Sequence, residues 1–383
     1  MNPVTIAIVG TGFVSDYYMT TLAGHSGLVL AGVFDSDAQR LTEFCAFHKV
    51  RAYPDFASVL ADQTISIVVN LTTPQAHYAV SRAALEAGKH VYSEKPLAMD
   101  LGEAEALVAL AQSKGLVLAS APSNALSDAN RLVADRLSAG AIGKPQLVYA
   151  EMEDGPVFRE KWQTWKSRSG ATWPGEHEFE IGCTLEHSGY ALSWLVGLFG
   201  AVEQVTSFSA LTFPDKGEGA HGNILGHDFS VGCLQFKSGV VARLTSGLAA
   251  PRDRSLTILG SKGSITVRDL WDNRSTVHLE QAGERRPLLH KILRRAEAKL
   301  GKALPFKLVP GRKLRYPAAT AQNLPAYPSQ IDFMAGVAAQ AQMISGASSA
   351  FYSGAVSLHI TELALALHHG RTLAQPYKVK NLF

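Results

Sequence analysis

A glycine-rich turn near the start of the chain carries residue types that can bind a phosphate group. Gly10-Thr11-Gly12-Phe13-Val14-Ser15 follows a run of apolar residues and precedes a helical pattern. The first glycine permits a tight turn, and the second lets the backbone approach a pyrophosphate at the helix N-terminus. Ser15 occupies the third position, where glycine or alanine keeps helix and strand close. The turn alone is weak evidence, because glycine turns after strands are common.

A carboxylate farther along the chain strengthens the interpretation of this turn. Asp35 follows the second predicted strand, where it can accept hydrogen bonds from both hydroxyls of an adenosine ribose. The same carboxylate would repel a 2′-phosphate, so we expect NAD as the cofactor and consider NADP less favoured. Arg40 is the residue that complicates this preference. Asp35 could instead cap the next helix, but Asp37 can fill that role.

Alternating elements surround these residues in the first third of the chain. Short β-branched runs alternate with longer helical patterns, as in a parallel sheet with helices on both faces. The strands are predicted at residues 4–9, 28–34, 65–71, 89–92 and 116–119, and the helices at 37–47, 75–86 and 101–113. We therefore predict an α/β fold with an N-terminal Rossmann domain, a doubly wound parallel sheet, over residues 1–122.

The pattern changes after Pro122. Strands are predicted at residues 147–152, 203–211, 229–236, 240–245, 256–259 and 264–268, and helices at 128–139, 184–198, 330–342 and 353–369. Glycines in the turns between consecutive strands predict a meander. We predict a C-terminal α+β domain for substrate binding and oligomerisation over residues 123–383, with an open, mainly antiparallel sheet. Its final helices can pack back on the N-terminal domain.

A basic insertion is predicted within that second domain, at residues 284–325. Lys and Arg crowd residues 285–315, where Glu297 is the sole acidic residue. Apolar residues recur there at helical spacing, which indicates an amphipathic basic helix. Such a helix can serve a membrane surface, an anionic substrate or a partner subunit. A solvated helix that covers the subunit is the plainer interpretation.

The overall composition narrows the class of protein and its compartment. The chain has 383 residues, of which 46% are hydrophobic and 18% charged, as expected for a globular protein with more than one core. A net charge of +3 predicts no nucleic-acid partner. Cys45, Cys183 and Cys233 lack the spacing of a metal site, so we expect free thiols in the cytoplasm. The sequence shows neither a secretion signal nor a candidate membrane span.

A second motif carries a resemblance to a known family. Residues 87–98, which contain Glu94-Lys95-Pro96, resemble the signature of the glucose-fructose oxidoreductase, inositol dehydrogenase and MocA family. Thr73-Pro74-Gln75-Ala76-His77 resembles the Thr-Pro-Asn-x-x-His turn of that family, and residues 140–145 resemble its link into the second domain. The resemblance covers nearly the whole chain, up to the late helix around residues 332–336.

The resemblance implies both an architecture and an activity. Family members join a Rossmann domain to an open antiparallel sheet, whose face packs in homodimers or homotetramers. The implied substrates are sugars, cyclitols and their derivatives, oxidised or reduced at a ring carbinol. Lys95 would lie where nicotinamide and substrate meet, and the C-terminal edge of a strand suits that role. The implied cofactor-binding residues are Gly10, Gly12, Phe13, Val14, Asp35, Arg40, Thr72, Pro74, His77, Glu94 and Lys95.

The chain departs from the family at a second motif, a glycine-led helix with Asp and then His four residues later. Here Glu186 stands for the aspartate and Tyr190 for the catalytic histidine, while His187 can reach the same face. A tyrosine that titrates near pH 10 needs a neighbouring cation to act as a base. Three assignments stay open: a Lys95/Tyr190 pair, His187 as the base, or Lys95 alone. Glu186 would orient a partner or bind a sugar hydroxyl.

An aromatic and basic segment before that helix is the candidate substrate wall. Trp162, Trp165 and Trp173 can stack on sugar rings, and Arg168 can hold a carboxylate or phosphate substituent. A loop that covers the domain core with its indoles is an equal alternative. The dense set of Glu and His at residues 176–187 could suggest a metal, but no HExxH or CxxC spacing is present. We expect no metal.

Three functions remain in view. The leading hypothesis is an NAD-dependent oxidoreductase that transfers a hydride between nicotinamide and a ring carbinol of a sugar, glycoside or cyclitol. A second is redox-neutral cleavage of a glycoside, in which transient oxidation at C3 permits elimination. A third is a catalytically silent NAD-binding regulator, against which the intact Lys95 and the polar residues of the site helix argue.

Overall fold

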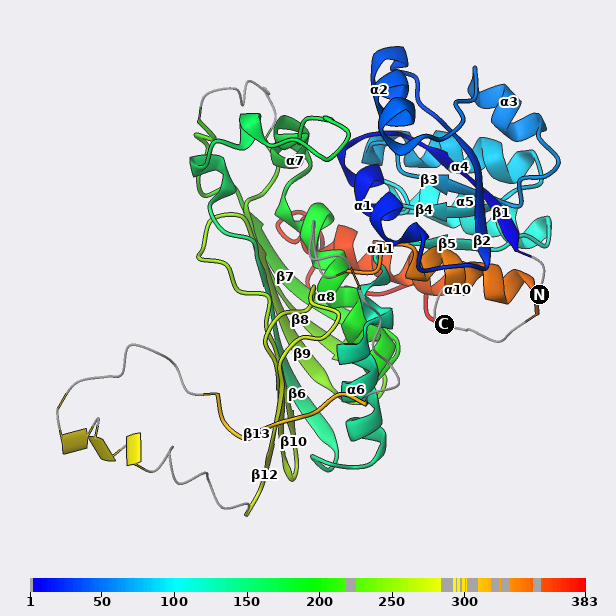
Figure 1. Ribbon diagram of the computed structural model, residues 1–383. Helices are drawn as coiled ribbons and strands as arrows, with labels where there is room; N and C mark the ends of the chain where they lie inside the picture. Colours follow the sequence, from blue (N-terminus) through cyan, green and yellow to red (C-terminus); the bar gives the residue numbers. More distant parts are fainter. Residues whose placement is uncertain are drawn as a thin grey trace.

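The computed structural model describes residues 3–217, 225–283, 309–317, 331–346 and 353–383, together with residues 292, 293, 295, 296, 298, 299, 301 and 324. Most of the basic insertion predicted at residues 284–325 lies outside the described residues, and of its predicted helix only residues 292, 293, 295, 296, 298 and 299 are described, all of them helical. Figure 1 shows two halves side by side, with the N-terminal half in blue and cyan and the second half in green and yellow.

The first half contains a five-stranded sheet in the order β2-β1-β3-β4-β5, in which every pair is parallel. Its strands are β1 (Val4–Val9), β2 (Leu28–Phe34), β3 (Ile67–Asn70), β4 (His90–Ser93) and β5 (Leu118–Ser120). The helices are α1 (Phe13–Leu22), α2 (Ala38–His48), α3 (Phe56–Ala61), η1 (Pro74–Ala76), α4 (His77–Glu86) and α5 (Leu101–Ser113). Along β1, Ile6 and Ile8 enter one core, whereas Ala7 and Val9 enter another. Both faces are therefore covered, as predicted for a doubly wound sheet.

The second half contains a nine-stranded sheet in the order β13-β12-β11-β10-β6-β9-β8-β7-β14. Its strands are β6 (Pro145–Glu153), β7 (Val202–Ala210), β8 (Phe229–Phe236), β9 (Val241–Gly247), β10 (Leu256–Gly260), β11 (Gly263–Val267), β12 (Val277–Gln281), β13 (Arg312–Lys313) and β14 (Tyr377–Lys378). The predicted meander is wrong at one point. A meander would make the consecutive strands β9 and β10 neighbours. Instead β6, the first strand of this half, lies between them and is parallel to β9. The remaining pairs are antiparallel.

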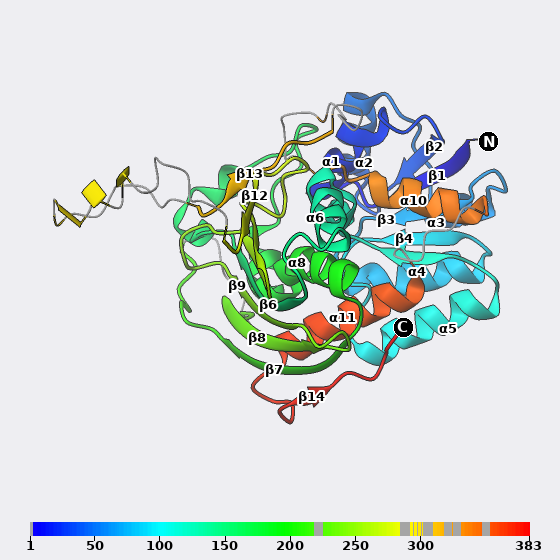
Figure 2. The same ribbon diagram turned by 90° about the horizontal axis from the view of Figure 1, so that it is seen from below.

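Helices from the middle and the end of the chain join the two halves. They are η2 (Ser123–Leu126), α6 (Asp128–Ser138), α7 (Gly175–Ile181), α8 (Cys183–Phe199), α10 (Ala335–Ile344) and α11 (Gly354–His368). Figure 2 shows α8 and α11 between the large sheet and the Rossmann half. On α10, the amide of Gln340 donates to the carbonyls of Val91 and Val117, at 2.7 and 3.0 Å. The C-terminal helices therefore pack on the first sheet as well as on the second.

Some short elements had no clear sequence signal. Neither α3 nor α7 was predicted, because six or seven residues give too few turns for helical periodicity to show. The strand β12 was also missed, since it lies beside the basic insertion. Over the part of the chain that the structure describes, no helix has the length and apolarity needed to cross a membrane.

Candidate active site

A cavity of about 1000 Å³ lies between the two halves. It is lined by the turns that follow β1 and β3, at the carboxyl ends of the parallel strands. From these two neighbouring strands the chain continues to opposite sides of the sheet, to β2 and to β4. In open α/β sheets, ligands bind at such a topological switch point. The opposite wall comes from the second half, mainly from α7, α8 and the segment before α7.

The glycine turn has the geometry of a phosphate cradle. Gly10 has a φ of +97°, and a Cβ there would lie 2.5 Å from the carbonyl oxygen of Leu71. Gly12 is the N-cap residue just before α1, where no side chain caps the helix, and a Cβ added there would meet no atom within 4 Å. The Ser15 hydroxyl donates to the carbonyl of Gly10 at 2.6 Å, so the serine at the third position folds back and leaves room. The turn and its free helix N-terminus therefore fit a pyrophosphate.

Asp35 lies at the end of β2 with its carboxylate already surrounded by donors. Thr11 donates its N–H and its hydroxyl to Oδ2 at 2.7 and 3.0 Å, and the N–H of Asp37 donates to Oδ1 at 2.9 Å. Arg40 adds two bonds, at 2.8 and 3.1 Å. Burial would raise the pKa of Asp35, but these hydrogen bonds hold it below its usual value. A ribose can use this carboxylate if Arg40 moves aside.

The Glu94-Lys95-Pro96 segment is held from two sides. Glu94 accepts from the Tyr18 hydroxyl of α1 at 2.7 Å and from the N–H of Lys95 at 3.0 Å. The buried ring of His77 contacts the carbonyls of Pro96 and Thr72, at 2.7 and 3.1 Å. Burial lowers the pKa of His77. Glu94 and His77 therefore position the loop after β4, although both also line the cavity.

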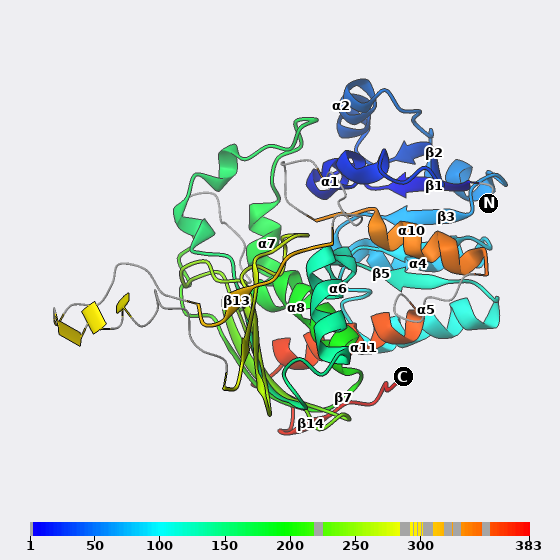
Figure 3. The same ribbon diagram turned by 60° about the horizontal axis from the view of Figure 1, so that its bottom comes forward.

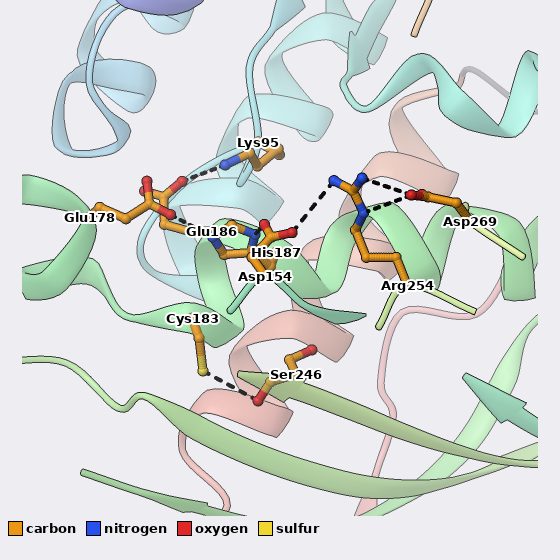
Figure 4. Close-up of polar contacts among 9 residues, drawn as sticks. All are labelled: Lys95, Asp154, Glu178, Cys183, Glu186, His187, Ser246, Arg254 and Asp269. Atoms are coloured by element: carbon orange, nitrogen blue, oxygen red, sulfur yellow. Dashed lines mark hydrogen bonds and ion pairs between the residues drawn. The ribbon is translucent and has the colours of Figure 1, made fainter. Parts of the chain in front are cut away.

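Lys95 and Glu186, from different halves, meet inside the cavity. The Lys95 ammonium contacts the Glu186 carboxylate (Figure 4), and only 15% and 11% of these side chains are exposed. Burial alone would lower the pKa of Lys95, but Glu186 raises it well above its usual value. Lys95 is therefore a cation at neutral pH.

Tyr190, one helical turn from Glu186, lies beneath the same lysine. The Lys95 nitrogen is 5.9 Å from the centre of its ring, which packs on Trp271 at 4.8 Å. Burial raises the pKa of Tyr190, and the nearby Lys95 only partly offsets this. The structure thus brings Lys95, Glu186 and Tyr190 together, with Lys95 over the phenol ring and the phenol protonated.

His187 faces a different direction, between two carboxylates. Its Nε2 lies 2.5 Å from Oε1 of Glu178 on α7, and its Nδ1 lies 2.5 Å from Oδ2 of Asp154. Burial lowers the pKa of this imidazole, but the two carboxylates outweigh burial and raise the pKa to about 10. A charged imidazole with both nitrogens occupied has no free lone pair with which to accept a proton.

Arg254 extends this set of buried charges beyond Asp154. It lies 3.5 Å from Asp154 and 2.7 Å from Asp269, and its guanidinium stacks over the Trp271 ring at 4.0 Å. Figure 4 shows the contacts that run from Glu178 through His187, Asp154 and Arg254 to Asp269, beside the separate pair of Lys95 and Glu186. Sequence analysis missed Asp154, Arg254 and Trp271, because each lies in a separate loop and no local spacing links them.

The structure separates the four candidate substrate-wall residues. Trp165 and Trp173 line the cavity. Trp162 is buried at 4% exposure in a small core with Phe179, and Arg168 lies over the ring of Phe47 in the first half. Within the described residues, no group of three or more His, Cys, Asp or Glu side chains is arranged to hold a metal ion. Cys45, Cys183 and Cys233 are free thiols.

Comparisons with known proteins agree with this geometry. A family model described as "Oxidoreductase family, NAD-binding Rossmann fold" matches residues 4–121, and one described as "GFO/IDH/MocA C-terminal domain" matches residues 130–266. The chain is 39% identical over 113 residues, 29% of its length, to UDP-N-acetylglucosamine 3-dehydrogenase from Acidithiobacillus ferrooxidans. The aligned part covers 34% of that relative, and 54% of another curated relative.

Solved structures share the complete fold at low sequence identity. An oxidoreductase from Agrobacterium radiobacter, in complex with NAD+, L-tartaric acid and magnesium, has a TM-score of 0.72 at 18% identity, with 99% of each chain covered. A 3-ketoreductase from Actinomadura kijaniata, in complex with TDP-benzene and NADP, has a TM-score of 0.70 at 19% identity, with 96% of this chain and 98% of that chain covered.

Proposed function

Because the chain belongs to the Gfo/Idh/MocA family of NAD(P)-binding oxidoreductases, we propose that it transfers a hydride between nicotinamide and a ring carbinol of a sugar, glycoside or cyclitol. One observation carries the proposal: Lys95 contacts Glu186 within the cavity that also contains the glycine turn. A pair able to move a proton therefore lies beside a cradle shaped for a dinucleotide.

We assign the proton chemistry to Lys95 and Glu186. When bound, nicotinamide would supply or accept the hydride. During reduction, the Lys95 ammonium donates a proton to the carbonyl oxygen of the substrate. During oxidation, Lys95 must first give up its proton to solvent, and the neutral amine then takes the hydroxyl proton. The resting site holds its proton on Lys95, so it is prepared for reduction without any prior transfer.

The other two candidate acid/base residues take supporting roles in this proposal. Tyr190 keeps its proton and therefore serves as a hydrogen-bond donor to the substrate oxygen. His187 is a positioning residue, because its two carboxylate partners come from α7 and from the end of β6. Of the three open assignments, the geometry favours Lys95, acting with Glu186 in place of Tyr190.

We propose NAD as the preferred cofactor. Asp35 stands at the end of β2, where a ribose would lie, and its carboxylate disfavours a 2′-phosphate. The Arg40 guanidinium, which is 40% exposed beside it, must move for the ribose to bind. This requirement weakens the preference, because a displaced guanidinium is also a phosphate ligand.

We also propose that the open face of the large sheet joins subunits in a homodimer or homotetramer. Tyr149, Phe208 and Val241 lie on the strands β6, β7 and β9 and are 39–50% exposed. The strand register puts the three side chains on one face of the sheet, and exposed apolar residues on one face favour an association site. Light scattering after gel filtration should give a mass above one chain, and a strictly monomeric protein would contradict this assembly.

A panel of sugars, cyclitols, glycosides and their keto derivatives, assayed for NADH formation or loss, tests the proposed activity. Lys95→Met should abolish the activity found. Lys114→Met, which alters an exposed lysine at the end of α5, should retain it. A flat absorbance trace with tightly bound NADH, together with no product formed from any panel compound, would favour a catalytically silent regulator.

A further inference from the structure

A small hairpin from the second half reaches across the mouth of the cavity. The segment 165–173, which we call the clasp hairpin, is closed by hydrogen bonds from the N–H of Ser167 to the carbonyl of Ala171 and from the N–H of Trp173 to that of Trp165. At its base, Trp162 packs edge-on against Trp173 and Phe179, with centroid distances of 6.0 and 5.4 Å. The tryptophans therefore give this hairpin a rigid base.

The tip of the clasp hairpin is bonded to the Rossmann half. Ser169 donates its N–H and its hydroxyl to Oδ2 of Asp16, at 3.1 and 2.7 Å. Asp16 is completely buried in α1, and its other oxygen contacts His48 of α2 at 2.5 Å. Arg168 adds a cation–π contact with Phe47, 5.8 Å from the ring centre. Figures 1 and 3 show the segment before α7 reaching toward α1 and α2.

The inner side of the clasp hairpin forms part of the cavity wall. Residues 170–174 line it together with Asp37, Arg40 and Glu43, which surround the adenosine end of the proposed dinucleotide site. A second crossing follows immediately, because His177 of α7 contacts Gln75 of η1 at 2.7 Å. Two bridges therefore join the halves beside this cavity.

We infer that the clasp hairpin completes the dinucleotide site from the substrate half and retains the dinucleotide through successive turnovers. This inference rests on the proposed function. For the adenosine end to leave, the contacts of Ser169 and Arg168 with α1 and α2 must break together. The buried Asp16 would then keep His48 but lose both donors on its Oδ2 oxygen, and a buried acceptor left without its donors is costly.

Retention of the dinucleotide has a chemical consequence for the cycle. A hydride and a proton taken from a carbinol must be returned, within the same cavity, to a carbonyl carbon and its oxygen. The acceptor of this hydride is one of two compounds. It is either the oxidised product itself, after elimination of its glycosidic substituent, or a second sugar that carries a carbonyl group. Either cycle yields no free NADH, as redox-neutral glycoside cleavage also requires.

The release rate of NADH tests the clasp. Full-length protein loaded with NADH is mixed with excess NAD+, and the loss of bound-NADH fluorescence is followed over time. We expect slow release from the wild type, and release at least about tenfold faster from Ser169→Ala and from Arg168→Ala. Thr164→Ala, which alters an exposed hydroxyl at the base of the hairpin outside the tip contacts, is the matched control and should match the wild type.

The outcomes separate this inference from the proposed function. If wild-type protein binds neither NADH nor NADPH, the proposed function fails. If NADH binds but both tip variants release it at the wild-type rate, the clasp is overturned while the function stands. Hydrogen exchange at residues 165–173 gives a readout independent of activity. NADH should slow exchange there in the wild type and much less in Ser169→Ala.

Discussion

The cofactor end of the cavity takes most of its residues from turns that directly follow parallel strands, whereas the substrate end takes them from segments far apart in the chain. At the cofactor end, the contacts of Gly10, Ser15 and His77 are made largely with backbone carbonyls nearby. At the substrate end, side chains pair with other buried side chains across both halves, as Lys95 does with Glu186 and His187 with Asp154.

This difference predicts different tolerance to substitution. A backbone contact in a preformed turn can be lost at the cost of a single hydrogen bond, typically about 0.5–1.5 kcal/mol. Removal of one member of a buried ion pair leaves its partner charged and unpaired, at a cost of about 3–5 kcal/mol. The substrate end should therefore be the more fragile of the two.

His187→Gln should have the largest effect on stability. Glu178 and Asp154 would remain buried without their shared cation, so the free energy of unfolding should fall by about 3–5 kcal/mol. Urea unfolding followed by tryptophan fluorescence measures the change. His177→Gln, on the partly exposed neighbouring helix α7, should stay within about 0.5 kcal/mol. Equal free energies of unfolding for the two variants would show that the contacts of His187 with Glu178 and Asp154 do not stabilise the fold.

The pH dependence of the free energy of unfolding is a second test of the contacts between His187 and its two carboxylates. The pKa of His187 is raised from 6.5 to about 10. Its contribution is therefore complete below pH 6.5 and is lost as the pH rises through about 10. Across this window, the free energy of unfolding of the wild type should fall more steeply than that of His187→Gln. An imidazole NMR signal assigned to His187 that titrates near pH 6.5 would refute this charge state.

Lys95→Met should lower kcat by about 100-fold or more, the usual scale of general acid–base catalysis, with little change in NADH affinity. Steady-state rates and fluorescence titration measure the two quantities. Tyr190→Phe should lose less, since the phenol supplies a hydrogen bond and Lys95 the proton. Equal losses in both single variants, with no further loss in the double variant, would restore a Lys95/Tyr190 pair.

Asp35→Ala should change cofactor preference by a smaller amount. Loss of ribose acceptors weakens NAD binding by about 0.5–3 kcal/mol, while Arg40, released from its partner, becomes available to a 2′-phosphate. The ratio of the NAD to NADP dissociation constants, measured by calorimetry, should therefore rise. An equal loss of affinity for both cofactors would contradict this role. Asp35 would then act only by holding the glycine turn, through its hydrogen bonds with Thr11.

Ser15→Ala should have the smallest effect. It removes one hydrogen bond to Gly10 and keeps a small side chain, so stability should drop by about 0.5–1.5 kcal/mol, with NADH affinity unchanged. Thermal unfolding and fluorescence titration give the two values. A large loss of NADH binding would mean that the cofactor end is as dependent on paired side chains as the substrate end.

Much of the first half could be predicted from local patterns. The predicted positions of β1, α2 and α5 agree with the structure to within a residue at either end. Helix caps and glycine turns act over three or four residues, so their signals are contained within the segments that they shape. The Glu94-Lys95-Pro96 motif was recognised for the same reason, since its residues are contiguous.

The sequence by itself determined the fold class, the glycine turn and eleven candidate residues that line the cavity from the Rossmann half. Only the tertiary structure decided that β6 separates β9 from β10, that His187 is enclosed by Glu178 and Asp154, and that Arg168 contacts Phe47. Periodicity and turn chemistry are short-range, so they can be inferred from neighbouring residues. Pairing between buried charges depends on which distant segments the two sheets bring together, and residue spacing carries no signal for that.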